Sequence, residues 1–135
     1  MAIEKTYGMI KPEAVRTCKT GKIIDRIEQE GFKIASMKKM QMTKELAERF
    51  YEVHKEKPFF GKLVESIIAG PIIAMVLEKD NAIAAWRELM GATDPAKAAE
   101  NTIRKLYGKN ITHNATHGSD APETAETEIK IIFGE

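Results

Sequence analysis

His117 offers the most versatile chemistry in this sequence, because an imidazole can serve as a nucleophile, a base or a metal ligand. It lies in the polar segment 114–120 (NATHGSD). Gly118 removes a side chain beside the imidazole, and we expect this to let a large ligand approach. A nucleophilic histidine needs one ring nitrogen free and the other held by a partner that fixes the tautomer, and Glu128 is the candidate partner. Taken alone, however, a histidine in a polar loop is most often structural or simply exposed.

Three cations, Lys11, Arg87 and Arg104, lie in segments far apart along the chain. Alone, Lys11 is an ordinary solvated turn lysine, and Arg87 could pair with a carboxylate across a helix turn. The sequence has no Gly-x-x-x-x-Gly-Lys-Ser/Thr loop, which excludes a P-loop nucleotide site. An anionic ligand must therefore be held by cations that only the fold can bring together.

The other polar residues near His117 allow further interpretations. Ser119 and Asp120 are expected to cap the helix that follows, whose N-terminal N–H groups would favour an anion. His113 stands four residues before His117, a spacing that binds zinc when both histidines share a helix face. The segment lacks helical periodicity and the lone cysteine is remote, so zinc is disfavoured. His54 is expected at the end of an amphipathic helix, where a cation suits the dipole.

The composition predicts one ordinary globular domain, residues 1–135, with 43% hydrophobic and 30% charged residues. A net charge of +1 gives no global field that would favour duplex DNA or an anionic membrane. The single Cys18 cannot form an internal disulfide, which fits a reducing cytosol. The first residues lack an apolar signal-peptide core, so we expect a cytoplasmic protein.

Three segments have the pattern of strands. Residues 2–10 form a first strand that stops at Lys11-Pro12, because the residue before a proline avoids helix geometry. Residues 32–42 alternate loosely between apolar and charged side chains, which predicts a strand with one solvated face. Residues 72–77 are a short apolar run bounded by turn signals, which predicts a central strand buried on both faces.

Helical spacing of apolar side chains appears between these strands. Gly31 sits where a left-handed residue is wanted after a helix, Thr43 can cap the next helix, and Asp94-Pro95 marks a further short one. The predicted longer helices span residues 20–30, 43–53, 58–70 and 81–90.

The last third of the chain is less regular. The apolar periodicity disappears from 101 to 118. A loop of this length in a compact domain is usually functional or disordered. We then expect a short helix over 122–127 and a final strand over 128–133, which begins at Glu128. The predicted fold is an α/β sandwich of ferredoxin-like βαββαβ type, with a four-stranded, mainly antiparallel sheet covered by helices.

Taken together, these residues resemble the nucleoside diphosphate kinase family over nearly the whole chain. The most specific elements are HGSD at 117–120 and KPFF at 57–60. GP at 70–71, GATDP at 91–95 and TIR at 102–104 support them. Several such strings in the family's order are far stronger evidence of the resemblance than any one of them. The sequence departs from the family's common residues at Asn101, 105–107, His113, 115–116 and Ala121, none of which has an assigned role.

The resemblance implies a ping-pong reaction. His117 would take the γ-phosphoryl group of a nucleoside triphosphate as a phosphohistidine and pass it to a nucleoside diphosphate bound in the same place. Lys11 and Tyr51 would contact the transferring group, while Glu128 and Ser119 would steady His117. Positioned cations and donors provide most of the catalysis in phosphoryl transfer, which makes such roles reasonable.

The resemblance also implies a nucleotide site. The residues implied are Arg87, Thr93 and Arg104 for the phosphates, Asn114 and Lys11 for the ribose hydroxyls, and Phe59 and Ile111 for the base. Every base has a π-face, so stacking predicts broad use of purine and pyrimidine nucleotides.

Magnesium on the phosphates is the implied cofactor, with Asp120 as the candidate for a contact through water. The implied assembly is a homo-oligomer, a tetramer or hexamer, that requires neither nucleic acid nor membrane. An RNA-recognition module shares the βαββαβ order, but it needs exposed aromatic residues that the aliphatic segment 72–77 lacks. A non-catalytic homologue is the second alternative, and the joint presence of Lys11, Arg104, Asn114 and His117 argues against it.

Overall fold

The computed structural model describes residues 3–111 and 113–134. The strands are β1 (Ile3–Ile10), β2 (Lys33–Met40), β3 (Ile72–Asp80) and β4 (Thr116–Gly118). The helices are α1 (Pro12–Arg16), α2 (Thr20–Gln29), α3 (Lys44–Phe50), α4 (Phe60–Ile68), α5 (Ala82–Met90), α6 (Ile103–Tyr107) and α7 (Pro122–Phe133). Two 3₁₀ turns, η1 (Glu52–His54) and η2 (Pro95–Lys97), complete the elements. In the described ranges no helix is long and apolar enough to cross a membrane.

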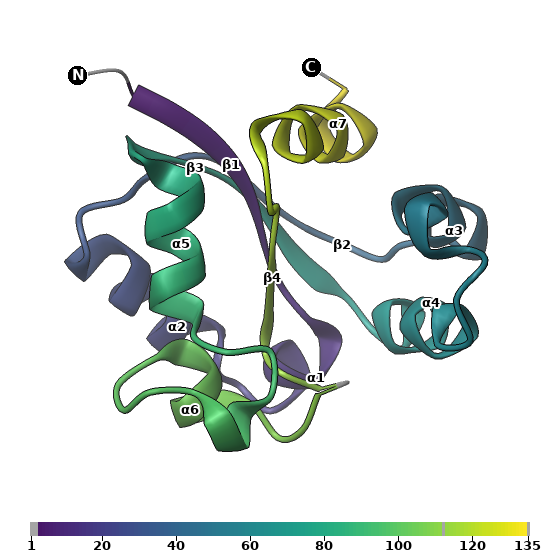
Figure 1. Ribbon diagram of the computed structural model, residues 1–135, viewed down its shortest axis with the longest axis horizontal. Coiled ribbons are helices and arrows are strands. Elements are labelled where there is room, and N and C mark those ends of the chain that lie inside the picture. The colour runs from purple at the N-terminus through teal and green to yellow at the C-terminus, as the bar shows by residue number, and fades with distance from the viewer. Residues whose placement is uncertain (1–2, 112, 135) are drawn as a thin grey trace.

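The sheet has the order β2-β3-β1-β4, and every neighbouring pair is antiparallel. This order confirms the ferredoxin-like prediction. Figure 1 shows α2, α5 and α6 on one side of the strands, with α3, α4 and α7 on the other. Each face of the sheet therefore has its own set of helices and its own apolar core.

Strand β3 confirms the interpretation of the apolar run 72–77, since all of these residues are buried. Successive side chains of a strand point to opposite faces. Accordingly Ile73, Met75 and Leu77 pack in the core beneath α2 and α5. Ile72, Ala74 and Val76 pack in the core beneath α3, α4 and α7.

Several predicted helix boundaries are confirmed. The Thr43 hydroxyl accepts a hydrogen bond from the Leu46 N–H at 3.1 Å, which caps α3. Gly31 has a φ of 90°, as expected for the left-handed residue after α2. The Asp94 carboxylate accepts from the Ala96 N–H at 3.0 Å and starts η2.

The predicted final strand over 128–133 is wrong, because α7 runs unbroken from Pro122 to Phe133. Its buried residues, Ala125, Glu128, Ile129 and Ile132, recur at spacings of three and four, which is the pattern of one helix face. The alternating Ile-Lys-Ile segment resembles a strand only when the helix is cut at Thr127.

The aperiodic stretch 101–118 contains two short elements that its sequence pattern did not predict. Thr102 caps α6 by accepting from the Lys105 N–H at 3.3 Å. Strand β4 then occupies the place beside β1 that the prediction gave to 128–133. Both elements are too short to show a periodicity.

Candidate active site

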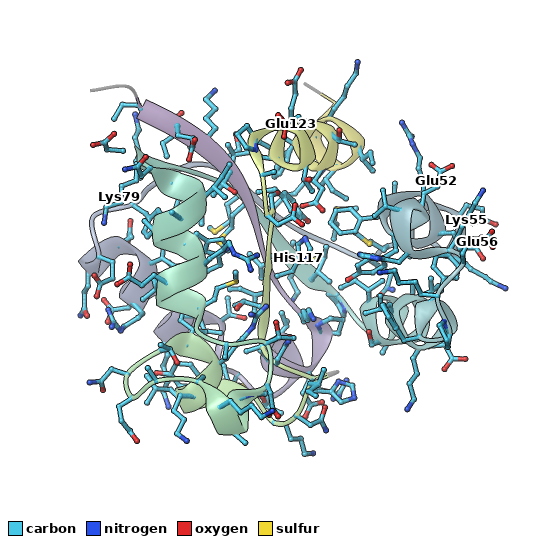
Figure 2. All side chains as sticks on the ribbon, in the orientation of Figure 1. Glu52, Lys55, Glu56, Lys79, His117 and Glu123 are labelled. Atoms are coloured by element: carbon cyan, nitrogen blue, oxygen red, sulfur yellow. The ribbon has the colours of Figure 1, made fainter. Side chains whose placement is uncertain are left out.

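His117 lies on β4, opposite Met9 of β1. Side chains that face each other across a strand pair point to the same face of the sheet. His117 therefore points to the α3, α4 and α7 side, as Tyr7 and Met9 do. Figure 2 shows its position in the middle of the molecule.

Gly118 does not have the role that was expected of it. A Cβ atom there would lie 2.4 Å from Cδ1 and 2.5 Å from Nε1 of Trp86, and 2.6 Å from Cε of Met90. Gly118 thus makes room for α5 on the opposite face of the sheet from the imidazole. The prediction that it opens space for a ligand is wrong.

His117 is held by a buried carboxylate. Its Nε2 lies 3.0 Å from Oε1 of Glu128, and the Ser119 hydroxyl donates to the same oxygen at 2.7 Å. A carboxylate accepts, so Nε2 carries the hydrogen and donates it to Glu128. The lone pair of His117 is therefore on Nδ1, which is the nitrogen able to attack an electrophile.

The expected cap by Ser119 and Asp120 is wrong. The N-cap of α7 is Ala121, which provides no side-chain cap. The Ser119 hydroxyl is directed to Glu128 instead, and Asp120 is exposed. The helix contributes to the site through Glu128, which it places within hydrogen-bonding distance of His117.

Aromatic rings surround the imidazole. The ring centroid of Phe50 is 5.2 Å from that of His117, that of Tyr7 is 6.0 Å away, and that of Tyr51 is 6.4 Å away. Burial first, and then the charge of Glu128, raise the pKa of Tyr51 and of Tyr7. Both phenols therefore keep their hydrogens, and Tyr51 can only act as a neutral donor or acceptor.

Lys11 follows the end of β1 and is itself buried. Its Nζ donates to Oδ1 of Asn114 at 2.8 Å, and Nδ2 of Asn114 donates to the Thr93 carbonyl at 3.0 Å. The Lys11 N–H also donates to the Ala115 carbonyl at 2.8 Å, which joins the end of β1 to the segment before β4. Burial, and then the nearby charge of Arg104, lower the pKa of Lys11 to about 7.

Arg104 projects from α6 and is 9% exposed. Its Nη1 donates to the Gly91 carbonyl at 3.1 Å, and its Nη2 donates to the Thr116 carbonyl at 2.9 Å. Nε is buried without a partner in the described chain. Burial, and then the charge of Arg87, lower the pKa of Arg104 to about 10. Arg87 itself is exposed on α5.

Phe59 and Ile111 lie at the outer part of this region, with side chains 44% and 58% exposed. Ile111 lines a cavity of about 900 Å³ whose opposite wall is α4, the helix that begins directly after Phe59. Neither Phe59 nor His117 lines that cavity. The structure therefore brings two groups of predicted site residues into contact. One group is His117, Glu128 and Ser119, and the other is Lys11, Asn114 and Thr93. It does not bring the two proposed neighbours of the base, Phe59 and Ile111, into contact with each other.

Some contributors were not identified from the sequence. The Trp86 Nε1–H donates to the His117 carbonyl at 3.2 Å and fixes the backbone at that histidine. Phe50, the last residue of α3, packs against the imidazole. The carbonyls of Gly91 and Thr116 hold Arg104, and no side-chain pattern could have revealed them.

The geometry can bind an anion beside a nucleophile. Two buried basic side chains, Lys11 and Arg104, border the segment that leads into His117, and the imidazole has one nitrogen held and one free. No group of three or more His, Cys, Asp or Glu side chains in 3–111 and 113–134 could hold a metal ion.

Comparison with known proteins gives one consistent result. The sequence model of the nucleoside diphosphate kinase family matches residues 4–135. The chain is 56% identical to nucleoside diphosphate kinase of Bradyrhizobium diazoefficiens, over 98% of this chain and 95% of that one. It is 51% identical to that of Persephonella marina with the same coverage.

Solved structures agree. The Aquifex aeolicus nucleoside diphosphate kinase superposes with a TM-score of 0.95 at 46% identity, covering 98% of this chain and 96% of the other. A halophilic nucleoside diphosphate kinase from Halobacterium salinarum, in complex with CDP, superposes with a TM-score of 0.95 at 42% identity. That match covers 99% of this chain and 90% of the other.

Proposed function

Since the chain belongs to the nucleoside diphosphate kinase family, we propose that His117 carries the phosphoryl group between two nucleotides. The protein is a phosphotransferase that moves the γ-phosphoryl group of a nucleoside triphosphate to a nucleoside diphosphate. The observation that best supports the role of His117 is its pairing with Glu128, 3.0 Å from Nε2, which leaves Nδ1 free.

The chemical step follows from that pairing. The Nδ1 lone pair attacks the γ-phosphorus, the bond from that phosphorus to the bridging oxygen breaks, and the nucleoside diphosphate leaves with the electron pair. Nε2 keeps its hydrogen, and Glu128 stabilises the positive charge that the ring gains. A second diphosphate then attacks the phosphohistidine, and the electron pair returns to Nδ1.

The phosphates are proposed to bind to Lys11, Arg104, Arg87 and Thr93, with Tyr51 as a donor to the transferring group. Arg104 supports this role because two carbonyls fix its guanidinium and its buried Nε lacks a partner in the described chain. A fixed guanidinium loses little freedom when it binds an oxyanion, and donors set in place before the reaction are those that stabilise its transition state.

The nucleoside is proposed to lie further out. Asn114 and Lys11 would bind the ribose hydroxyls, while Phe59 and Ile111 would enclose the base. The exposure of both apolar side chains supports this placement, since a base would cover them. Stacking gives little selectivity among bases. The CDP in the Halobacterium salinarum complex is a pyrimidine nucleotide, which supports broad base use in the family.

Magnesium is the proposed cofactor, and the phosphates themselves would provide most of its ligands. The described side chains form no carboxylate cage, which fits an ion that arrives with the nucleotide. Asp120 is exposed just after β4, and its carboxylate is the proposed contact to the ion through water. The ion would neutralise charge on the phosphates during transfer.

We further propose a homo-oligomer, a tetramer or hexamer, in the cytoplasm, with residues 1–135 as one domain. Strand β2 is at the edge of the sheet and Met37 on it is 50% exposed, which supports contact with another copy. An exposed, unpaired Cys18 fits a reducing compartment. Light scattering tests the assembly, and cell fractionation tests the location. A single cooperative unfolding transition is expected if residues 1–135 form one domain.

The proposed role of His117 is tested by transfer from ATP to CDP. We expect the wild-type protein to form CTP and His117→Ala to lose at least about 1,000-fold in rate, as enzymes do when they lose a covalent nucleophile. His113→Ala is the matched control, since it removes a histidine from the same segment and should stay within about threefold. Transfer by His117→Ala at the wild-type rate would contradict the proposal.

A further inference from the structure

The imidazole of His54 touches two aromatic side chains that have roles in the proposed function. Its ring centroid is 5.8 Å from that of Phe59, with the planes tilted by 49°, and 6.3 Å from that of Tyr51. Phe59 is the proposed neighbour of the base, and Tyr51 the proposed donor to the phosphoryl group. One imidazole therefore links the two parts of the nucleotide site.

Phe59 depends on this contact more than Tyr51 does. Tyr51 is 5% exposed and also packs against Phe50, with ring centroids 5.1 Å apart. Phe59 is 44% exposed, and the other aromatic or cationic group against its ring in the described chain is the Lys57 ammonium, at 5.9 Å. Loss of the His54 ring would leave Phe59 with little to fix its orientation.

The backbone keeps the imidazole in place. The His54 N–H donates to the Tyr51 carbonyl at 2.8 Å, and the His54 carbonyl accepts from the Lys57 N–H at 2.9 Å. The Phe60 N–H then donates to the Lys57 carbonyl at 3.1 Å. These turns connect α3 to α4 in short steps. Figure 2 shows Glu52, Lys55 and Glu56 of the same connection on the side turned away from His117.

The contact with Phe59 depends on the aromatic ring of His54 and not on hydrogen bonds made by its ring nitrogens. Its Nδ1 is buried and has no partner among the described residues. An unpaired buried nitrogen opposes folding, so an apolar ring of similar shape should serve at least as well. A phenylalanine at this position offers that ring.

We propose that His54 is a positioning residue of the nucleotide site, whose ring holds Phe59 in the orientation in which the base stacks on it. This inference rests on the proposed function. An aromatic pair contributes about 2- to 12-fold to an equilibrium, and this is the effect expected on nucleotide affinity. We expect the change in affinity to come from contacts with the base and not from contacts with the phosphates.

The test compares His54→Ala and His54→Phe with the wild type. In His54→Ala the dissociation constant of ADP and the KM for diphosphates should rise about 2- to 12-fold, with kcat within about twofold. Inhibition by inorganic tripolyphosphate, which has no base, should not change. His54→Phe should bring the ADP affinity back to within about twofold of the wild type.

Two further variants sharpen the test. In a Phe59→Ala background, His54→Ala should have no additional effect on ADP binding, because the ring that it positions is gone. Val53→Ala is the matched control, since Val53 is 84% exposed in the same turn and should change neither constant.

Additive effects of His54→Ala and Phe59→Ala would overturn the inference, and so would an equal loss of tripolyphosphate binding. No recovery in His54→Phe, with an unfolding transition like that of the wild type, would overturn it too. If Phe59→Ala alone leaves ADP binding unchanged, stacking on Phe59 and this inference are both wrong. The transfer assay on His117→Ala would still judge the phosphoryl-transfer proposal separately.

Discussion

Raising the pH from about 7.5 to about 9 should weaken nucleotide binding about tenfold per pH unit, because Lys11 must gain a proton to hold a phosphate. In the free protein Lys11 is 8% exposed and its hydrogen-bond partner is the neutral Asn114 side chain. Burial and the charge of Arg104 lower its pKa to about 7. A bound phosphate would supply the missing negative charge and raise that pKa.

The size of the effect follows from the lowered pKa of about 7. At pH 8.5 about 3% of free sites would hold the proton on Lys11. If the phosphate raises the pKa well above about 9, each binding event takes up nearly one proton. The cost of adding that proton is roughly 2 kcal/mol at pH 8.5. The nucleotide phosphate does not contribute, because its second pKa is about 6.

The lowered pKa of Lys11 also determines how the stability of the nucleotide-free protein changes with pH. The folded pKa of Lys11 is lowered below its ordinary value of 10.5 to about 7, so the unfolded chain binds more protons between these two pH values. The contribution of Lys11 to the free energy of unfolding should therefore rise with pH across this window. Bound nucleotide should reduce that rise.

Calorimetry of ADP binding in two buffers of different ionisation enthalpy measures the proton uptake. We expect close to one proton at about pH 8.5 in the wild type and close to none in Lys11→Met. Lys39→Met removes an exposed lysine from β2 and should behave like the wild type. Uptake near zero in the wild type, or an equal uptake in Lys11→Met, would refute the assignment of this proton to Lys11.

Three other changes have definite expected results. Arg104→Lys should lose about 100- to 1,000-fold in transfer rate, because the compact ammonium lacks the planar fork that reaches both carbonyls and still presents an N–H to a phosphate. Equal steady-state kinetics would remove Arg104 from the site. Gly118→Ala should lower the free energy of unfolding by about 1–3 kcal/mol, because the added Cβ would lie 2.4 Å from Trp86. Denaturation followed by tryptophan fluorescence measures this free energy, and an unchanged value would contradict the tight packing. Tyr7→Phe should leave the free energy of unfolding unchanged or raise it by about 1 kcal/mol, because the buried hydroxyl has no partner in the described chain; a clear loss in the same denaturation assay would contradict this.

The elements that the sequence could predict are those with a strong local pattern. The apolar run of β3 has to be buried on both faces, and Thr43 and Gly31 mark helix ends by their own chemistry. The segment 122–133 failed because a helix face and a strand alternation share apolar positions over a short stretch. Only the longer spacing from Ala125 to Ile132 separates the two.

The residues of the candidate site could be named from the sequence, but most of their contacts could not. The sequence indicated that Glu128 could hold His117, and the structure gives that contact, although from a helix and not from a strand. Gly118 was assigned to the wrong face, because a three-residue strand such as β4 has no detectable alternation. The buried partners of Arg104 are backbone carbonyls, which carry no signal in the sequence.

The identity of the nitrogen that carries the phosphoryl group decides whether His117 reacts as proposed. The protein would be incubated with γ-labelled ATP and no acceptor, and the phosphoprotein analysed by ³¹P NMR and mass spectrometry. The pairing of Nε2 with Glu128 predicts phosphate on Nδ1 of His117 and none on a His117→Ala protein. Phosphate on Nε2, or on another residue in a protein that still catalyses transfer, would contradict the proposed role of His117.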